Sequence, residues 1–84
     1  MKELKIVQVE DLGSIGQLYA LIDVERKKIL ATHSCSDRYF AYSDLWGRRN
    51  DIRKLAKALY GEDCKAVVCL TIAFSQEEYT WLGD

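Results

Sequence analysis

The sequence predicts a small α+β domain, in which a sheet of about four strands, antiparallel or mixed, packs one main helix on one face. Three observations lead to this fold class. Residues 65–74 are the longest apolar run and are rich in β-branched side chains, which suits a buried strand. Residues 17–24 and 29–34 read as two strands around a short charged turn, the pattern of a hairpin. Residues 52–60 repeat apolar side chains at helical spacing. The expected order of elements is β-β-β-α-β-α.

Length and composition indicate one ordinary globular unit. The chain has 84 residues, of which 49% are hydrophobic and 30% charged, so we expect a single domain spanning residues 1–84. No apolar run reaches the ~18–20 residues of a membrane-spanning helix. Residues 1–6 carry charge without an apolar signal core, so we expect a cytoplasmic protein with no membrane partner. The formal net charge of −1 argues against a dedicated nucleic-acid binder.

The first half of the chain is predicted to form three strands. Residues 4–9 form the first strand, and residues 10–16 connect it to the second, because two glycines and a serine interrupt any periodicity. Residues 25–28 form a four-residue hairpin turn, since the Asn-Gly or Asp-Gly signature of a two-residue turn is absent. Alternation along the second strand assigns one face to Leu18, Ala20, Ile22 and Val24, and the other to Tyr19, Leu21 and Asp23.

The middle of the chain contains the main helix. Residues 35–37 have turn chemistry, and the aromatic residues 38–43 are expected to be extended. The helix is expected to begin with Asn50 as N-cap and to end at Gly61, with residues 43–46 as a separate helical turn in front. The side chains expected to face the core are Ile52, Leu55, Ala56, Leu59 and Tyr60.

The C-terminal part is predicted to form an interior strand and a short helix. Both sides of residues 65–74 are apolar, which favours a strand in the interior of the sheet. Ser75 and Glu78 have the spacing of a capping box, which predicts a helix over residues 76–82. In that helix, Tyr79 and Leu82 would turn back toward the sheet.

A basic row on the main helix is the sharpest candidate site. Residues 48–57 contain five basic side chains and one acidic side chain, a local charge of +4, and aromatic residues flank them. Such a row can hold phosphates while bases stack on the aromatic rings, or it can hold an acidic protein. It can equally be a solvated helix face that keeps the domain soluble. The candidate partner-binding residues are Trp46, Arg49, Arg53, Lys57, Tyr42, Tyr39 and Tyr60.

A second candidate surface is acidic. The chain from Glu62 onward has a local charge of −4, from five acidic residues and Lys65. If the partner is an enzyme that handles nucleic acid, this surface could imitate phosphate and occupy the basic groove of that enzyme. Its candidate residues are Glu62, Asp63, Glu77 and Glu78.

No motif indicates a catalytic, metal or cofactor site. The four side chains that could ligate zinc are His33, Cys35, Cys64 and Cys69, and their spacing lacks the tight knuckle of structural zinc sites. A Cys35–His33–Asp37 triad would lack the long-range constellation and oxyanion hole of nucleophilic enzymes. The segment Gly13–Gly16 precedes a strand and has no lysine after it, unlike a phosphate loop. We therefore expect no enzymatic activity, no metal and no cofactor.

The sequence favours a small, non-enzymatic intracellular binding module that acts through contact with another protein. A nucleic-acid-contacting accessory protein is the first alternative. The second is a self-associating structural domain, such as a homodimer using the hairpin face of Tyr19 and Leu21. A short chain without motifs is also the profile of phage and mobile-element accessory proteins, including inhibitors of host defence complexes such as anti-CRISPR proteins. That association follows from size alone.

Overall fold

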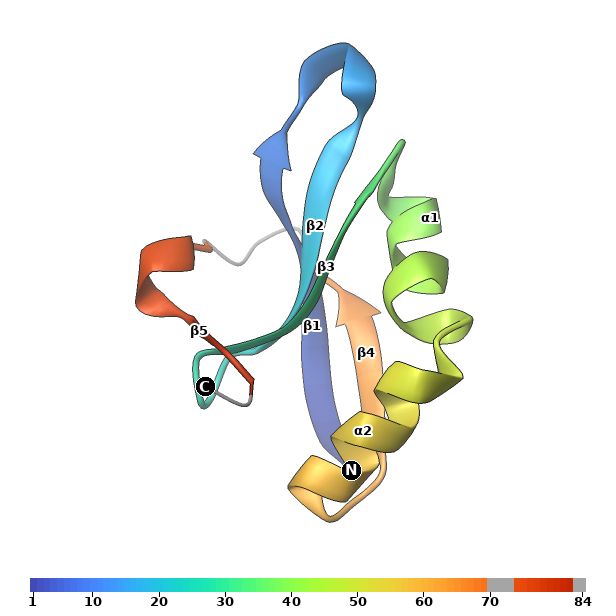
Figure 1. Ribbon diagram of the computed structural model, residues 1–84, viewed down its shortest axis with the longest axis vertical. Helices are drawn as coiled ribbons and strands as arrows, with labels where there is room; N and C mark the ends of the chain where they lie inside the picture. Colours follow the sequence, from blue (N-terminus) through green and yellow to red (C-terminus); the bar gives the residue numbers. More distant parts are fainter. Residues whose placement is uncertain (70–73, 83–84) are drawn as a thin grey trace.

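One mixed sheet organises the computed structural model, which describes residues 1–69 and 74–82 (Figure 1). The elements in chain order are β1 (Lys2–Asp11), η1 (Gly13–Ile15), β2 (Gln17–Asp23), β3 (Lys28–Cys35), α1 (Arg38–Tyr42), η2 (Ser43–Gly47), α2 (Asn50–Tyr60), β4 (Cys64–Val68), η3 (Gln76–Glu78) and β5 (Thr80–Trp81).

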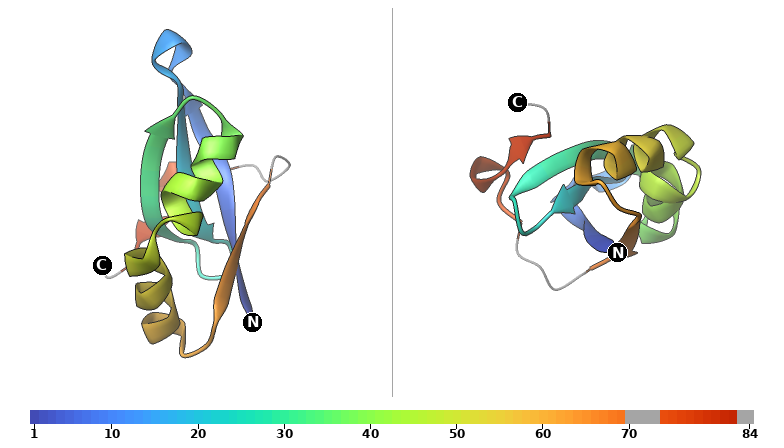
Figure 2. Two further views of the ribbon diagram at one scale, coloured as in Figure 1. Left: turned by 90° about the vertical axis from the view of Figure 1, so that its right-hand side faces the viewer. Right: turned by 90° about the horizontal axis from the view of Figure 1, so that it is seen from below.

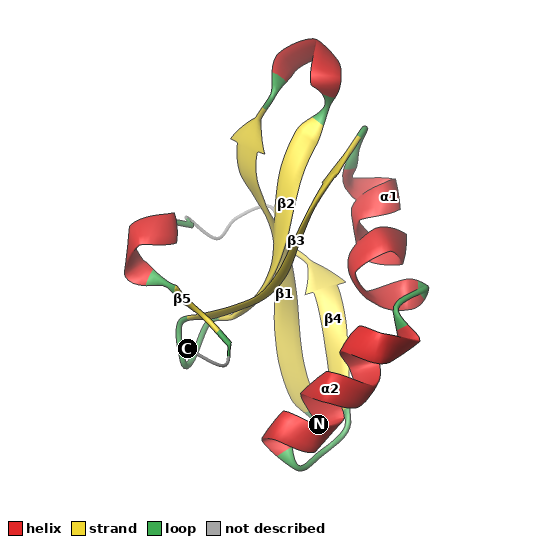
Figure 3. Cartoon of the chain, in the orientation of Figure 1, coloured by secondary structure: helices red, strands yellow, loops and turns green. Residues whose placement is uncertain are grey.

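The five described strands lie in the order β4-β1-β2-β3-β5. The β1–β2 and β2–β3 pairs are antiparallel, whereas β4 runs parallel to β1 and β5 runs parallel to β3. The predicted α+β class with one main helix is confirmed, and the sheet has one strand more than the four that were expected (Figure 3).

Both faces of the sheet are covered (Figure 2). The helices α1, η2 and α2, which we call the helical layer, pack on one face, and the C-terminal segment packs on the other. As predicted, alternation along β2 sends its side chains to opposite faces. The buried cluster under the helical layer contains Leu4, Ile6, Tyr19, Leu21, Ala41, Leu45, Trp46, Ile52, Ala56 and Ala66. The cluster on the second face contains Val7, Ala20, Ile22 and Ile29, with Val9, Phe74 and Tyr79 packed against it.

The predicted hairpin is confirmed, with a four-residue loop between β2 and β3. Asp23 stabilises this loop because its Oδ1 accepts hydrogen bonds from the backbone N–H groups of Glu25 (3.1 Å) and Arg26 (3.3 Å). Lys27 closes the loop in the left-handed region, with φ of 54°. The loop therefore begins one residue earlier than predicted.

Residues 65–68 form a strand as predicted, but the prediction that this strand lies in the interior of the sheet is wrong. β4 lies at an edge of the sheet, and among the described residues it pairs only with β1. Residues 70–73 of the predicted strand lie outside the described part of the chain. Ala66 is buried against the helical layer, so the apolar character of β4 follows from packing on its face, not from neighbouring strands on both sides. The middle position belongs to β2, which is buried from Tyr19 to Asp23.

The prediction that residues 38–43 are extended is also wrong, since α1 is helical. Asp37 is its N-cap: one carboxylate oxygen accepts hydrogen bonds from the N–H groups of Tyr39 (3.0 Å) and Phe40 (3.4 Å). This cap and the burial of Ala41 outweigh the strand propensity of the aromatic residues. The helical turn predicted in front of the main helix is confirmed as η2, which has π-helical geometry.

The main helix α2 has the predicted extent, and Gly61 caps its C-terminus with φ of 72° and a hydrogen bond to the Lys57 carbonyl. Its N-cap is Arg49, one residue before the predicted position. The predicted core-facing stripe is too wide. Leu55 and Leu59 are about half exposed, because the sheet covers only one side of the helix.

The helix predicted over residues 76–82 is reduced to the single turn η3, followed by β5. The predicted capping box is not formed, because the Ser75 side chain makes no capping hydrogen bond. Tyr79 does turn back to the sheet as predicted. Its ring centroid lies 4.8 Å from that of Phe74, and both rings pack on the second face.

Candidate binding surface on the helical layer

Two arginines of the predicted basic row already have partners within the chain. Arg49 donates from Nε and Nη2 to the two carboxylate oxygens of Asp51, at 3.0 and 2.9 Å. These hydrogen bonds hold the pKa of Asp51 at about 2, below its usual value. Arg53 donates from Nη1 to the backbone carbonyls of Trp46 (2.6 Å) and Gly47 (2.7 Å). The guanidinium of Arg53 therefore fixes the junction between η2 and α2.

A cavity of about 340 Å³ lies beside this junction and collects several predicted residues. Lys57 pairs with Asp63 at 3.0 Å, and both side chains are about two-thirds exposed. Lys54 has no carboxylate within 4 Å among the described residues. The cavity is lined by Met1, Trp46, Arg53, Lys54, Lys57, Asp63 and Cys64.

Two aromatic residues of the predicted site pack in or against the core. Trp46 is only 5% exposed and belongs to the cluster under the helical layer. The ring of Tyr60 lies 5.3 Å from the Lys2 ammonium and 5.2 Å from the Arg26 guanidinium. Burial and the neighbouring Asp23 carboxylate raise the pKa of Tyr60 above its ordinary value. Both residues stabilise the free chain through packing.

Other apolar side chains of the helical layer remain in solvent. Five of them have exposed fractions between 42% and 76%. The sequence had assigned two of the five to the core and had missed a third, the phenylalanine of α1. We call these residues the exposed helical set: Tyr39, Phe40, Tyr42, Leu55 and Leu59.

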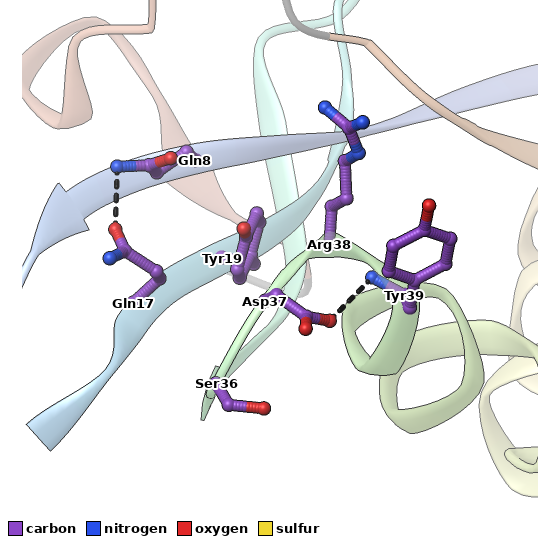
Figure 4. Close-up of a pocket in the computed structure, with 7 residues that line it drawn as sticks. All are labelled: Gln8, Gln17, Tyr19, Ser36, Asp37, Arg38 and Tyr39. Carbon is purple, nitrogen blue, oxygen red and sulfur yellow. Dashed lines mark hydrogen bonds between the residues drawn. The ribbon is translucent and has the colours of Figure 1, made fainter.

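A second cavity, of about 410 Å³, opens between β1, β2 and the start of α1 (Figure 4). Among its lining residues, Gln8 donates to Gln17 at 2.7 Å, and the Arg38 guanidinium lies 5.8 Å from the centre of the Tyr39 ring. Of the predicted residues only Tyr39 lines it. A sequence signal for the glutamines existed: they continue the alternation of inward side chains at the polar ends of β1 and β2. The lining residues are Gln8, Gln17, Tyr19, Ser36, Asp37, Arg38 and Tyr39.

The histidine and cysteines do not assemble a reactive site in the described part of the chain. His33 Nε2 lies 3.3 Å from an Asp44 carboxylate oxygen. The Cys35 thiol donates to the Asp37 backbone carbonyl at 3.3 Å, and its pKa is raised by burial and by Asp44. A thiol with a raised pKa is a poor nucleophile at neutral pH. The described residues contain no group of three or more His, Cys, Asp or Glu side chains able to hold a metal ion.

The structure does not bring the four acidic candidates together. Asp63 and Glu62 follow α2, where Glu62 pairs with the N-terminal ammonium at 3.1 Å. Glu77 and Glu78 belong to η3, at a separate place in the fold, and Glu78 lies 3.5 Å from the Lys27 ammonium (Figure 1). The four predicted acidic residues therefore form two separate small surfaces and not a single one.

The described helices include none with the length and apolar character needed to cross a membrane. Comparison of the chain with protein-family models, curated proteins and solved structures gives no match.

Proposed function

We propose that this chain is a non-enzymatic, intracellular binding domain that recognises another protein through its helical layer. The observation that supports this function is the exposed helical set, which stays in solvent although both faces of the sheet are covered. Exposed apolar side chains beside arginine and lysine have the composition of protein–protein contact surfaces. Tyrosine and arginine are also the residues that contribute most to binding energy at such surfaces.

A protein partner fits the charges better than a nucleic acid does. Binding to a phosphate backbone depends on several cations that are free to neutralise successive phosphates. In the basic row, Arg49 and Lys57 are paired with carboxylates and Arg53 is hydrogen-bonded to two carbonyls. The remaining two cations of the row, Arg48 and Lys54, offer only a short series of positive charges to a polyanion.

Affinity capture with matched variants tests the proposal. We expect proteins captured from the source cell by the native chain to be lost by the double variant Tyr39→Ala/Phe40→Ala. Ile15→Ala is the control, because Ile15 is exposed at the tip of the β1–β2 hairpin, away from the helical layer. Equal capture by all three chains, measured by quantitative mass spectrometry, would show that the exposed helical set is not the contact surface.

Binding of labelled oligonucleotides separates the first alternative. Affinity for nucleic acid that falls steeply with salt, with a smaller slope in Arg48→Gln/Lys54→Gln, would favour a nucleic-acid function instead. Self-association is tested by sedimentation, and it would have to use surfaces other than Tyr19 and Leu21, which lie buried under the helical layer. The expectation of a phage-type inhibitor adds no residue to the proposal, since it rests on chain length.

A further inference from the structure

The cavity beside α2 combines positive charge with an apolar wall. Three of its lining side chains are cationic, and Asp63 is the one carboxylate among them. The buried ring of Trp46 also lines it. This combination suits an anionic side chain.

The cations of the cavity differ in how firmly they are held. Arg53 is fixed by two backbone carbonyls that use only Nη1, so the N–H groups on Nε and Nη2 are separate from those contacts. Lys57 is held by Asp63 alone, and an exposed ion pair of this kind is weak. Lys54 has no carboxylate partner among the described residues. Asp63 therefore marks a position where a carboxylate meets Lys57 in a weak ion pair.

We infer that this cavity binds a side-chain carboxylate of an acidic segment on the partner protein, which takes the place of Asp63 beside Lys57. The inference rests on the proposed function and names the chemistry of the partner. A carboxylate fits better than a nucleic-acid backbone, because the cavity offers one anion position beside Lys57 and not a track of successive cations.

The test uses the full chain with three defined probes: octaglutamate, octaglutamine and oligothymidylate. Trp81→Phe provides the background, because it leaves Trp46 in the cavity wall as the single tryptophan. Tryptophan fluorescence and amide chemical shifts are followed during titration at low ionic strength, where exposed charges are least screened. We expect octaglutamate to bind and to shift the amides around the cavity, and octaglutamine not to bind.

The variants should change the affinity for octaglutamate in opposite directions. Lys54→Gln and Lys57→Gln should each weaken octaglutamate binding by about two- to fivefold, the range of an exposed ion pair. Asp63→Asn should strengthen it by a similar factor, because the competing carboxylate is gone. Lys27→Gln is the matched control, since Lys27 lies in the β2–β3 loop outside the cavity, and it should leave affinity unchanged. Circular dichroism checks that each variant is folded.

Three outcomes overturn the inference: octaglutamate fails to bind, Asp63→Asn weakens binding, or Lys27→Gln acts as strongly as Lys54→Gln. Preferential binding of oligothymidylate at the cavity would overturn it in favour of nucleic acid. The proposed function is tested independently of the carboxylate site. If partner capture depends on Tyr39 and Phe40 but not on Lys54, the proposed binding function is supported and the carboxylate site is excluded.

Discussion

Asp23 is a charged residue with no exposed surface, so the stability of the fold depends on the groups that pair with its carboxylate. Its carboxylate lies 3.0 Å from the Lys2 ammonium and also accepts the N–H groups of the hairpin loop. Burial alone would raise the pKa of Asp23, but these interactions outweigh burial and lower it. One side chain thus connects β1, β2 and the loop that follows.

Asp23→Asn should reduce the free energy of unfolding by about 3 kcal/mol, because it leaves the largely buried Lys2 ammonium without its buried partner. Urea denaturation measures the loss. Glu25→Gln is the control: Glu25 also pairs with Lys2 but is exposed, so its loss should cost less than about 1 kcal/mol. Equal losses in the two variants would contradict a special role for the buried carboxylate.

The same pair sets the acid stability. A carboxyl group whose pKa is lowered in the folded state stabilises the fold at pH values above its pKa in the unfolded chain, which is near 4. This contribution disappears as the pH falls through the pKa of the group in the folded chain. Asp51, with its pKa of about 2, acts in the same direction. The melting temperature should therefore fall between about pH 4 and pH 2. Asp23→Asn should show a flatter pH dependence, measured by thermal denaturation at successive pH values.

Tyr60 presents the opposite case, because its buried hydroxyl group adds little to the stability of the fold. Its hydroxyl is buried next to the Asp23 carboxylate, but it makes no hydrogen bond of good geometry in the described part of the chain. Tyr60→Phe should leave the free energy of unfolding unchanged or raise it by about 1 kcal/mol. Because the pKa of Tyr60 is raised, the native chain should also lose stability above about pH 10, and the variant should lose less. A clearly destabilised variant at pH 7 would show that the hydroxyl does make a favourable contact.

At the scale of elements, Arg53 joins η2 to α2. Arg53→Met keeps the aliphatic stem but removes the donors to the Trp46 and Gly47 carbonyls, so we expect a loss of about 1–3 kcal/mol in the free energy of unfolding. Lys54→Met, at the next position, should change it by less than about 0.5 kcal/mol. Urea denaturation compares the two, and similar values would contradict a structural role for Arg53.

The hydrogen bonds that Arg53 makes within the fold explain why the site was only partly predictable. Periodicity correctly located α2, and the charge pattern correctly gathered Arg53 and Lys57 on one flank. It could not reveal that Arg53 is hydrogen-bonded to carbonyls, because those carbonyls belong to a π-helical turn without a sequence signature. Trp46 was chosen as an exposed anchor for its residue type, yet tertiary packing buries it. Side-chain exposure depends on the neighbouring layer, which local pattern does not encode.

Element types were predictable where periodicity was strong, as in the hairpin and α2. α1 was missed because the Asp37 cap and the burial of Ala41 together favour a helix over the extended form expected of an aromatic segment. The position of β4 was missed for a different reason. An apolar run reports burial, and it does not report how many strands lie beside it. Pairing of β4 with β1 joins Cys64 to Lys2, a contact between distant parts of the sequence.

At the scale of the whole molecule, the C-terminal segment closes the second face of the sheet. Tyr79→Ala should lower the free energy of unfolding by about 1–3 kcal/mol and increase binding of a hydrophobic dye, because the cluster around Ile22 and Ile29 loses its cover. Trp81→Ala is the control, since Trp81 is exposed and packs in neither cluster. Unchanged dye binding in Tyr79→Ala would show that this face is shielded by other means.

The parallel pairing of β1 with β4 has a consequence for biosynthesis. β1 leaves the ribosome first, but it gains its second neighbour only after the hairpin, the helical layer and β4 have all been made. Until then, its outer backbone groups are an open template for strands of other nascent chains. Translation that stalls within α2 would therefore release fragments prone to aggregate, whereas an uninterrupted chain protects this edge by itself.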